Sequence, residues 1–201
     1  MANDPALHRQ PAREPGDKRA AILDAALALF AERGFHGTAV PLVAARAGVG
    51  AGTMYRYFPS KEALVNALYR HWKQVITATM LESFPLDAEP RALFAEGWRR
   101  LSAFATAHPR AFVFLELHHH APYLDEESRA ADARVLLPLR AFVEQAQRTG
   151  AVRDDPPELL MALVFGAVVG VVRAAEAGHL PVSREDALAR AEARVWEAIR
   201  R

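Results

Sequence analysis

The sequence predicts an all-α protein, and three observations agree on this fold class. Apolar residues recur every three or four positions along most of the chain, which is the spacing of a helix face. No long run alternates β-branched with polar residues, as a strand would. Glycines and prolines divide the chain into segments of helix length. With 201 residues, 51% of them hydrophobic and 24% charged, the chain can bury a core of its own, and it contains no cysteine for disulfides, metal ligation or thiol catalysis.

The helices are expected in order between these breaks. Residues 1–16 hold three prolines and are expected to be a disordered tail, after which Asp17 is placed to cap the first helix. That helix runs to about residue 33, where Gly34 can adopt the left-handed conformation that ends a helix. Further helices are expected at residues 40–47, 51–58, 60–82, 90–107, 109–120, 123–149, 157–177 and 183–200. Pro138 lies inside one of them and is expected to kink or split it.

The segment from residue 159 to 172 is nearly all apolar. Because a membrane span needs about 20 such residues, we interpret this segment as a buried helix and not as a span. A helix that is apolar on every side must be covered on every side, either by a second copy of the chain or as the central helix of a monomer core. Glycines spaced four apart favour the first, since they allow two helices to approach closely. The residues expected at this dimer interface are Leu163, Gly166, Gly170 and Trp196.

Residues 38–61 carry the most informative pattern, which is a short helix, a tight turn that contains glycine, and a second short helix. This is the spacing of a helix-turn-helix, whose second helix enters the major groove of DNA. Two helices this short cannot bury their apolar sides alone, so the helix that ends near residue 33 is expected to pack against them. The alternative is a tight three-helix packing that binds no nucleic acid.

The second of these short helices has two faces. Met54 and Phe58 lie four residues apart and are expected to point inward, with Ala51 beneath them. A glycine inside a helix costs about 1 kcal/mol, and a close approach to a phosphate backbone would be a reason to keep one. Threonine, arginine and tyrosine side chains can bond base edges or phosphates. The residues left for the outer face are Gly52, Thr53, Arg56 and Tyr57.

The N-terminal part of the chain resembles the DNA-binding domain of TetR/AcrR-type transcriptional regulators. The resemblance covers residues 22–64, ILDAALALFAERGFHGTAVPLVAARAGVGAGTMYRYFPSKEAL. Beyond residue 64 only the length and the number of helices match. The shared features are Gly34-Phe35 at a helix end, Thr38 before the second helix, Ala47-Gly48-Val49 at the turn, and Gly52-Thr53-x-Tyr55-x-x-Phe58-x-x-Lys61.

The resemblance implies a head that reads the major groove and contacts the flanking phosphates. It also implies that the helix over residues 60–82 links this head to a ligand-binding body, that an effector tilts this helix, and that the last two helices form a homodimer. Polar or basic residues are common in the family where Gly50 and Ala51 stand, so base readout is expected to rest on Thr53, Arg56 and DNA shape. The residues expected to contact DNA are Thr38, Val40, Gly50, Ala51, Gly52, Thr53, Tyr55, Arg56, Tyr57 and Lys61.

The helices after residue 90 are rich in aromatic residues, which are expected to form an ordinary core together with a pocket for an apolar or aromatic molecule. Three consecutive histidines at residues 118–120 invite a metal hypothesis. Successive helical residues point about 100° apart, however, so three in a row cannot converge on one ion. We therefore expect no metal and no cofactor. The candidate pocket residues are Trp98, His119, Arg140 and Phe165.

Together these patterns predict a DNA-binding head at residues 17–63 and a ligand-binding, dimerising body at residues 64–201. The charge distribution agrees, since residues 1–70 carry nine Lys and Arg against six Asp and Glu, although the whole chain is only +1. The expected function is cytoplasmic repression from a pseudo-palindromic DNA operator, released by a small molecule, with no membrane partner. The alternatives are a DNA-binding protein without an effector, and a metal-dependent enzyme in the helical body, for which no nucleophile motif or phosphate loop is found.

Overall fold

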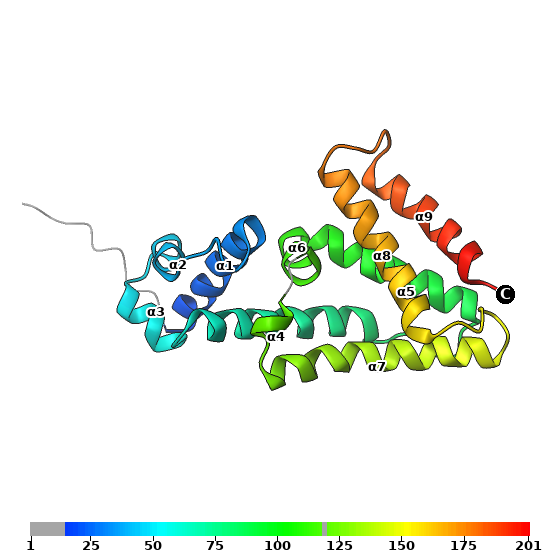
Figure 1. The fold of residues 1–201 in the computed structure, drawn as a ribbon, viewed down its shortest axis with the longest axis horizontal. Coiled ribbons are helices and arrows are strands. Elements are labelled where there is room, and N and C mark those ends of the chain that lie inside the picture. The colour runs from blue at the N-terminus through cyan, green and yellow to red at the C-terminus, as the bar shows by residue number, and fades with distance from the viewer. Residues whose placement is uncertain (1–14, 118–119) are drawn as a thin grey trace, which may run out of the picture. The chain divides into compact units, whose positions relative to one another are not determined.

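The computed structural model describes residues 15–117 and 120–201, which form nine α-helices and one short 3-10 helix (Figure 1). No β-strand forms within these residues, and the one extended pairing they contain is an isolated antiparallel bridge between Val152 and Arg200. This confirms the all-α fold class. The chain divides into two compact units, Met1–Leu64 and Val65–Arg201.

The first unit is a three-helix arrangement that ends with the first turn of a fourth helix. Its helices are α1 (Pro15–Arg33), α2 (Val40–Ala47), α3 (Ala51–Tyr57) and the start of α4 (Lys61–Leu81). As expected, α1 supplies the apolar surface that the two shorter helices cannot provide for themselves. The largest fully buried side chains of this unit are Ile22, Leu29, Phe30, Val43, Met54 and Leu64.

Both ends of α1 can be compared with the sequence prediction. Gly34 follows the helix with a φ of 68°, the left-handed conformation that glycine adopts without a steric penalty. The start was placed wrongly: α1 begins at Pro15, so Asp17 lies in the first helical turn and not at the cap. A proline suits the first helical position, because its missing N–H would have no partner there. Residues 1–14 of the expected tail lie outside the described residues.

The second unit contains the rest of α4 and all the later helices. These are α5 (Pro90–Ala107), α6 (Pro109–Leu117), the 3-10 helix η1 (Ala121–Tyr123), α7 (Glu126–Arg148), α8 (Pro157–Glu176) and α9 (Arg184–Ile199). α5 packs against α6, α8 and α9, whereas α7 packs against α8, and α8 and α9 lie side by side (Figure 1). Pro138 is accommodated inside α7 without splitting it. The fully buried side chains include Phe104, Phe112, Phe114 and Val168.

Within one chain α8 is covered on one side only. Leu160, Val168 and Val172 are buried against neighbouring helices, but Leu159 and Leu163 are 47% and 50% exposed. By length and composition alone α8 could cross a membrane, and only 17% of its most apolar stretch is buried. The expected complete burial of this helix is therefore not achieved by the single chain.

Candidate nucleic-acid interface

The turn between α2 and α3 sets the direction of α3. Gly48 adopts a φ of 67° and its N–H donates to the Ala45 carbonyl over 3.1 Å. Val49 donates to the Ala44 carbonyl over 3.0 Å, so the carbonyls at the end of α2 are satisfied by the turn itself. Gly50 then returns to an extended conformation and α3 begins at the next residue. This is a helix-turn-helix, as the spacing predicted.

One face of α3 is fixed in the core of the first unit. Met54 is fully buried and Phe58, which follows the helix, is 4% exposed. The Arg19 guanidinium lies 5.6 Å from the centre of the Phe58 ring. Ala51 is exposed and does not lie beneath Met54 as expected, because the inward packing of α3 starts one turn after its first residue. The inner face is therefore shorter than the pattern suggested.

The other face of α3 is open. Gly50, Ala51, Gly52 and Arg56 are exposed, and Tyr55 is 49% exposed. Thr53 and Tyr57 are partly buried at the edge of this face, and the Arg56 guanidinium lies 5.6 Å from the centre of the Tyr57 ring. The face thus combines a cation and two phenols with a stretch of backbone that carries almost no side chains.

The two glycines on this face are not required by the packing of the chain. A Cβ atom added at Gly50 or Gly52 would meet no atom within 4 Å, and neither residue has a positive φ. Gly52 lies inside α3, where glycine is less favourable than alanine by about 1 kcal/mol. Among the described residues no contact compensates for this cost.

Thr38 does not have the role expected from the resemblance. Its side chain is fully buried, and its hydroxyl, which has one hydrogen to donate, lies within hydrogen-bond distance of the carbonyls of Leu29 and Gly34, at 3.1 and 2.9 Å. A hydroxyl in this position cannot reach a phosphate. Thr38 instead ties the loop after α1 to the end of that helix, and its expected DNA contact is wrong.

Lys61 is also a structural residue. Its ammonium donates to the carbonyls of Phe35 and Thr38, at 2.8 and 3.0 Å, and lies 4.1 Å from the centre of the Phe35 ring. Two of its three N–H groups therefore donate hydrogen bonds to the loop after α1. This fixes the first turn of α4 to the helix-turn-helix and leaves Lys61 poorly placed as a phosphate ligand. Val40, the first residue of α2, is partly buried.

The candidate pocket residues of the second unit are not brought together. Trp98 is 5% exposed and its indole N–H donates to the Leu188 carbonyl over 3.1 Å, so it joins α5 to α9 in the core. Arg140 is on the surface, with ion pairs of 2.8 Å to Glu144 and to Glu158. His119 lies outside the described residues. Phe165 of α8 is partly buried. The pocket of Trp98, His119, Arg140 and Phe165 therefore stays a prediction.

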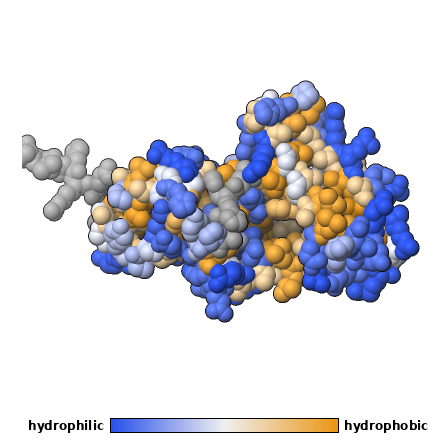
Figure 2. Space-filling model, in the orientation of Figure 1, coloured by the Kyte–Doolittle hydropathy of each residue, from blue (hydrophilic) through white to orange (hydrophobic). Residues whose placement is uncertain are grey.

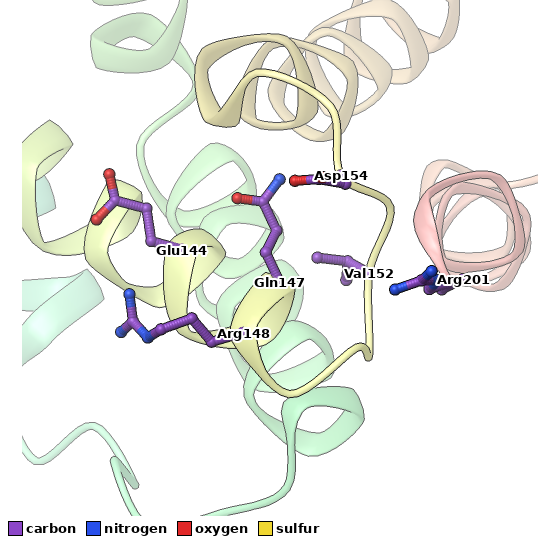
Figure 3. Close-up of a pocket in the computed structure, with 6 residues that line it drawn as sticks. All are labelled: Glu144, Gln147, Arg148, Val152, Asp154 and Arg201. Carbon is purple, nitrogen blue, oxygen red and sulfur yellow. The ribbon is translucent and has the colours of Figure 1, made fainter.

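Two cavities lie in the second unit, and Trp98, Arg140 and Phe165 line neither of them. The larger, of about 370 Å³, lies between the end of α7 and the loop that leads to α8 (Figure 3). Gln147 extends toward Asp154 across this space, and its amide donates to the Asp155 carbonyl over 2.6 Å. The smaller, of about 310 Å³, lies beside the end of α4 and is lined by Ala78, Thr79, Glu82, Ser83, Arg99, Arg100 and Ala103. Charged and polar side chains predominate in both.

The expected dimer residues divide into two groups. Leu163, Gly166 and Gly170 are exposed along the uncovered side of α8. Trp196 is partly buried within its own chain, where its ring centre lies 5.2 Å from that of Phe94. Its expected role at the interface stays a prediction, because part of the side chain is still accessible beside its aromatic partner on α5.

Sequence reasoning missed a buried group of charges in the second unit. Lys73 on α4 is 8% exposed and forms ion pairs with Asp132 of α7 at 2.7 Å and with Glu116 of α6 at 3.8 Å. The Tyr69 hydroxyl donates to the same Asp132 carboxylate over 3.2 Å. Desolvation by burial raises the pKa of Tyr69 to about 12 and also raises the pKa of Glu116. The available signal was the spacing of Asn66, Arg70 and Lys73, which places three polar residues on one face of the helix.

A helix-turn-helix with an open second helix, joined by α4 to a larger helical unit, defines a DNA-binding transcriptional regulator. The chain belongs to the TetR family of bacterial regulatory proteins. The family's N-terminal model matches residues 22–68, and a tetracyclin repressor-like C-terminal domain matches residues 69–201.

Individual relatives and solved structures agree with this assignment. The transcriptional regulator RutR of Escherichia coli K12 is 31% identical over 153 residues, covering 75% of this chain and 71% of RutR. YhgD, a regulator of Bacillus subtilis, is 26% identical over 84% of this chain and 90% of its own length. A TetR-family regulator from Marinobacter aquaeolei superimposes with a TM-score of 0.79 at 25% identity, covering 92% of this chain and 96% of that one. A putative family member from Shewanella gives a TM-score of 0.76 at 27% identity, with 92% and 98% covered.

Proposed function

We propose that this regulator is a cytoplasmic repressor that binds a pseudo-palindromic operator as a homodimer and is released by a small molecule. The open face of α3 is the observation that carries the proposal. It presents a cation, two phenols and a glycine that the fold itself does not need. Arg56 and Thr53 would read base edges, and Tyr55 and Tyr57 would bond the flanking phosphates.

The DNA contact of α3 is tested by the salt-dependent affinity of an arginine variant. Arg56→Ala removes an exposed side chain that forms no ion pair with any described residue, so the fold should be unaffected. A lost base contact is worth about 1–3 kcal/mol, and we expect operator affinity to fall by about tenfold or more. Arg134→Ala, an exposed arginine of α7, is the matched control and should leave the affinity unchanged. Equal affinity of Arg56→Ala and the wild type, measured by fluorescence anisotropy, would exclude this role.

The homodimer is supported by the uncovered side of α8. Leu159, Leu163, Gly166 and Gly170 follow one another at intervals of four, three and four residues, so they share one helix face. Figure 2 shows apolar and pale surface along α8 on this face of the molecule. A Cβ atom at either glycine would meet nothing within 4 Å, so this chain leaves room for a close neighbour. A second copy is the occupant that a closed twofold assembly requires.

A charge placed on this side of α8 tests the dimer. Leu163→Lys would bury a lysine between the two copies, so it should give monomers in sedimentation velocity and abolish tight operator binding. Leu86→Lys is the control, because Leu86 is 64% exposed and lies outside α8. A Leu163→Lys variant that remains dimeric would place the interface elsewhere.

The effector is proposed to be a small apolar or aromatic molecule bound in the second unit. The likeness of this unit to the C-terminal domain of tetracyclin repressor supports a ligand site. A compound library is screened by thermal shift, and compounds that raise the melting temperature are then tested for release of the bound operator. Compounds that stabilise the protein and lower its operator affinity support an effector.

A DNA-binding protein without an effector is the second candidate. It is favoured by the charged and polar residues that line the larger cavity, since ligand sites are mostly apolar. Operator affinity that no stabilising compound changes would select this function and exclude the proposed release.

A further inference from the structure

One face of α4 is polar and tied to the start of α7. The Asn66 amide donates to the Tyr123 carbonyl over 2.8 Å and accepts from the Asp125 N–H over 2.9 Å. Four residues later, the Arg70 guanidinium donates to the Asp125 carboxylate over 2.8 Å and to the Ser128 hydroxyl over 3.1 Å. These contacts fix α4 and the first turn of α7 to each other.

The next polar residue on this face, Lys73, has two competing partners. Its ammonium lies 2.7 Å from Asp132 on α7, which is hydrogen-bond distance, but 3.8 Å from Glu116 on α6. One positive charge thus stands between two carboxylates that belong to different helices. The Tyr69 hydroxyl donates to the nearer carboxylate, that of Asp132, over 3.2 Å.

The charges of this cluster do not balance. Lys73 is 8% exposed and the Glu116 side chain is 11% exposed, so both groups have lost most of their water. A buried lysine needs one carboxylate for neutrality. Asp132, whose side chain is 36% exposed, supplies it at the shorter distance, and the more deeply buried Glu116 carboxylate then costs free energy unless it too can be paired or protonated. In agreement, desolvation by burial raises the pKa of Glu116, and the neighbouring Asp132 adds to this effect. A purely structural ion pair would not require the second acid.

The same helix is fixed to the DNA-binding unit at its other end. Lys61 donates to the carbonyls of Phe35 and Thr38, so the first turn of α4 belongs to the helix-turn-helix. α4 then runs without interruption to Leu81. A change in how Lys73 is held can therefore be passed along one continuous helix to the DNA-binding unit.

We propose that Lys73 is a positioning residue with two positions, closer to Asp132 in this structure and closer to Glu116 in the other, and that the exchange sets operator affinity. In the first position the middle of α4 is held to α7, and in the second it is held to α6. The pairing is a two-state element of the kind that regulatory transitions use. This inference rests on the proposed function, since operator binding is what it regulates.

Two isosteric variants separate the positions. Among the described residues, Glu116→Gln leaves Lys73 paired with the Asp132 carboxylate alone, and Asp132→Asn leaves it paired with the Glu116 carboxylate alone. Each keeps the shape of the side chain and one charged partner for the lysine. We expect the two variants to change operator affinity in opposite directions, each by about fivefold or more, which is the usual range of such couplings. Affinity is measured by fluorescence anisotropy, with folding checked by circular dichroism and the oligomeric state by sedimentation.

A merely structural ion pair would give a different result. It would make both variants less stable and would shift operator affinity in the same direction or not at all, and either outcome overturns the proposal. A variant that does not fold also overturns it, because the proposal requires either carboxylate alone to be sufficient.

A distance measurement tests the two positions of Lys73 without DNA. It therefore gives a result even if the protein binds no operator. The chain contains no cysteine, so spin labels can be attached at Gln74→Cys on α4 and Arg134→Cys on α7, both exposed positions. Labelled protein is diluted with unlabelled protein so that each distance lies within one subunit. The label distance should be longer in Asp132→Asn than in Glu116→Gln. Equal distances would overturn the two positions, whereas different distances without operator binding would contradict only the proposed function.

Discussion

Replacing Gly52 by alanine should have opposite effects on stability and on DNA binding. A Cβ atom at this position meets no atom within 4 Å and the φ of Gly52 is not positive, so the methyl group fits the folded chain. Alanine in place of a compatible glycine stabilises by about 0.4–1 kcal/mol. In a chain of this length that corresponds to a rise in melting temperature of about 1–4 °C.

The same methyl group lies on the open face of α3, where we place the DNA. If the backbone of this turn approaches the operator closely, the methyl group must push the two surfaces apart, and we expect affinity to fall by about tenfold, or 1.4 kcal/mol. Melting is followed by circular dichroism and affinity by fluorescence anisotropy. Gly97→Ala is the matched control, because Gly97 lies in α5 with the same open space around its Cβ position. It should raise the melting temperature without changing affinity. Unchanged operator affinity of Gly52→Ala would refute the reasoning.

Three further changes test the assigned roles. Thr38→Val removes the buried hydroxyl and should lower the free energy of unfolding by about 1 kcal/mol in urea titrations, while operator affinity of the folded protein stays as in the wild type. Lys61→Met should lower the free energy of unfolding by about 1–2 kcal/mol. The slope of log affinity against log salt concentration should change by less than about 0.9, the change expected from the loss of one phosphate contact. In the folded protein the pKa of Glu116 is raised above 4.5, so protonation of this carboxylate stabilises the folded state at low pH. As the pH rises from 4.5 through the raised pKa, the wild type loses this stabilisation, so the melting temperature of Glu116→Gln should rise relative to that of the wild type. A difference in melting temperature that does not change with pH would contradict this.

The helices were largely predictable because their ends are set by local chemistry. Gly34 and Gly48 take the left-handed conformation at helix ends, and Pro90 and Pro157 begin helices. These signals need no knowledge of the rest of the fold. The start of α1 was misplaced because Asp17 suits both a cap and a first turn.

The roles of single polar side chains were less predictable, because they depend on contacts between distant residues. Lys61 bonds the Phe35 carbonyl, 26 positions earlier, and no local pattern shows that this carbonyl needs a donor. Trp98 bonds the Leu188 carbonyl, 90 positions later, which turned a candidate ligand contact into a core contact. Asp132 lies 59 positions after Lys73, so their pairing follows only from the packing of α7 on α4.

Selection of bound DNA from a random-sequence library tests the central claim most directly. The protein is incubated with the library at moderate salt, and bound fragments are amplified and sequenced over successive rounds. A homodimer that reads the major groove with two copies of α3 predicts an enriched inverted repeat, with half-sites about one helical turn apart. Enrichment of the repeat should disappear with Arg56→Ala and persist with Arg134→Ala. A library that remains random after binding would contradict sequence-specific recognition by this protein.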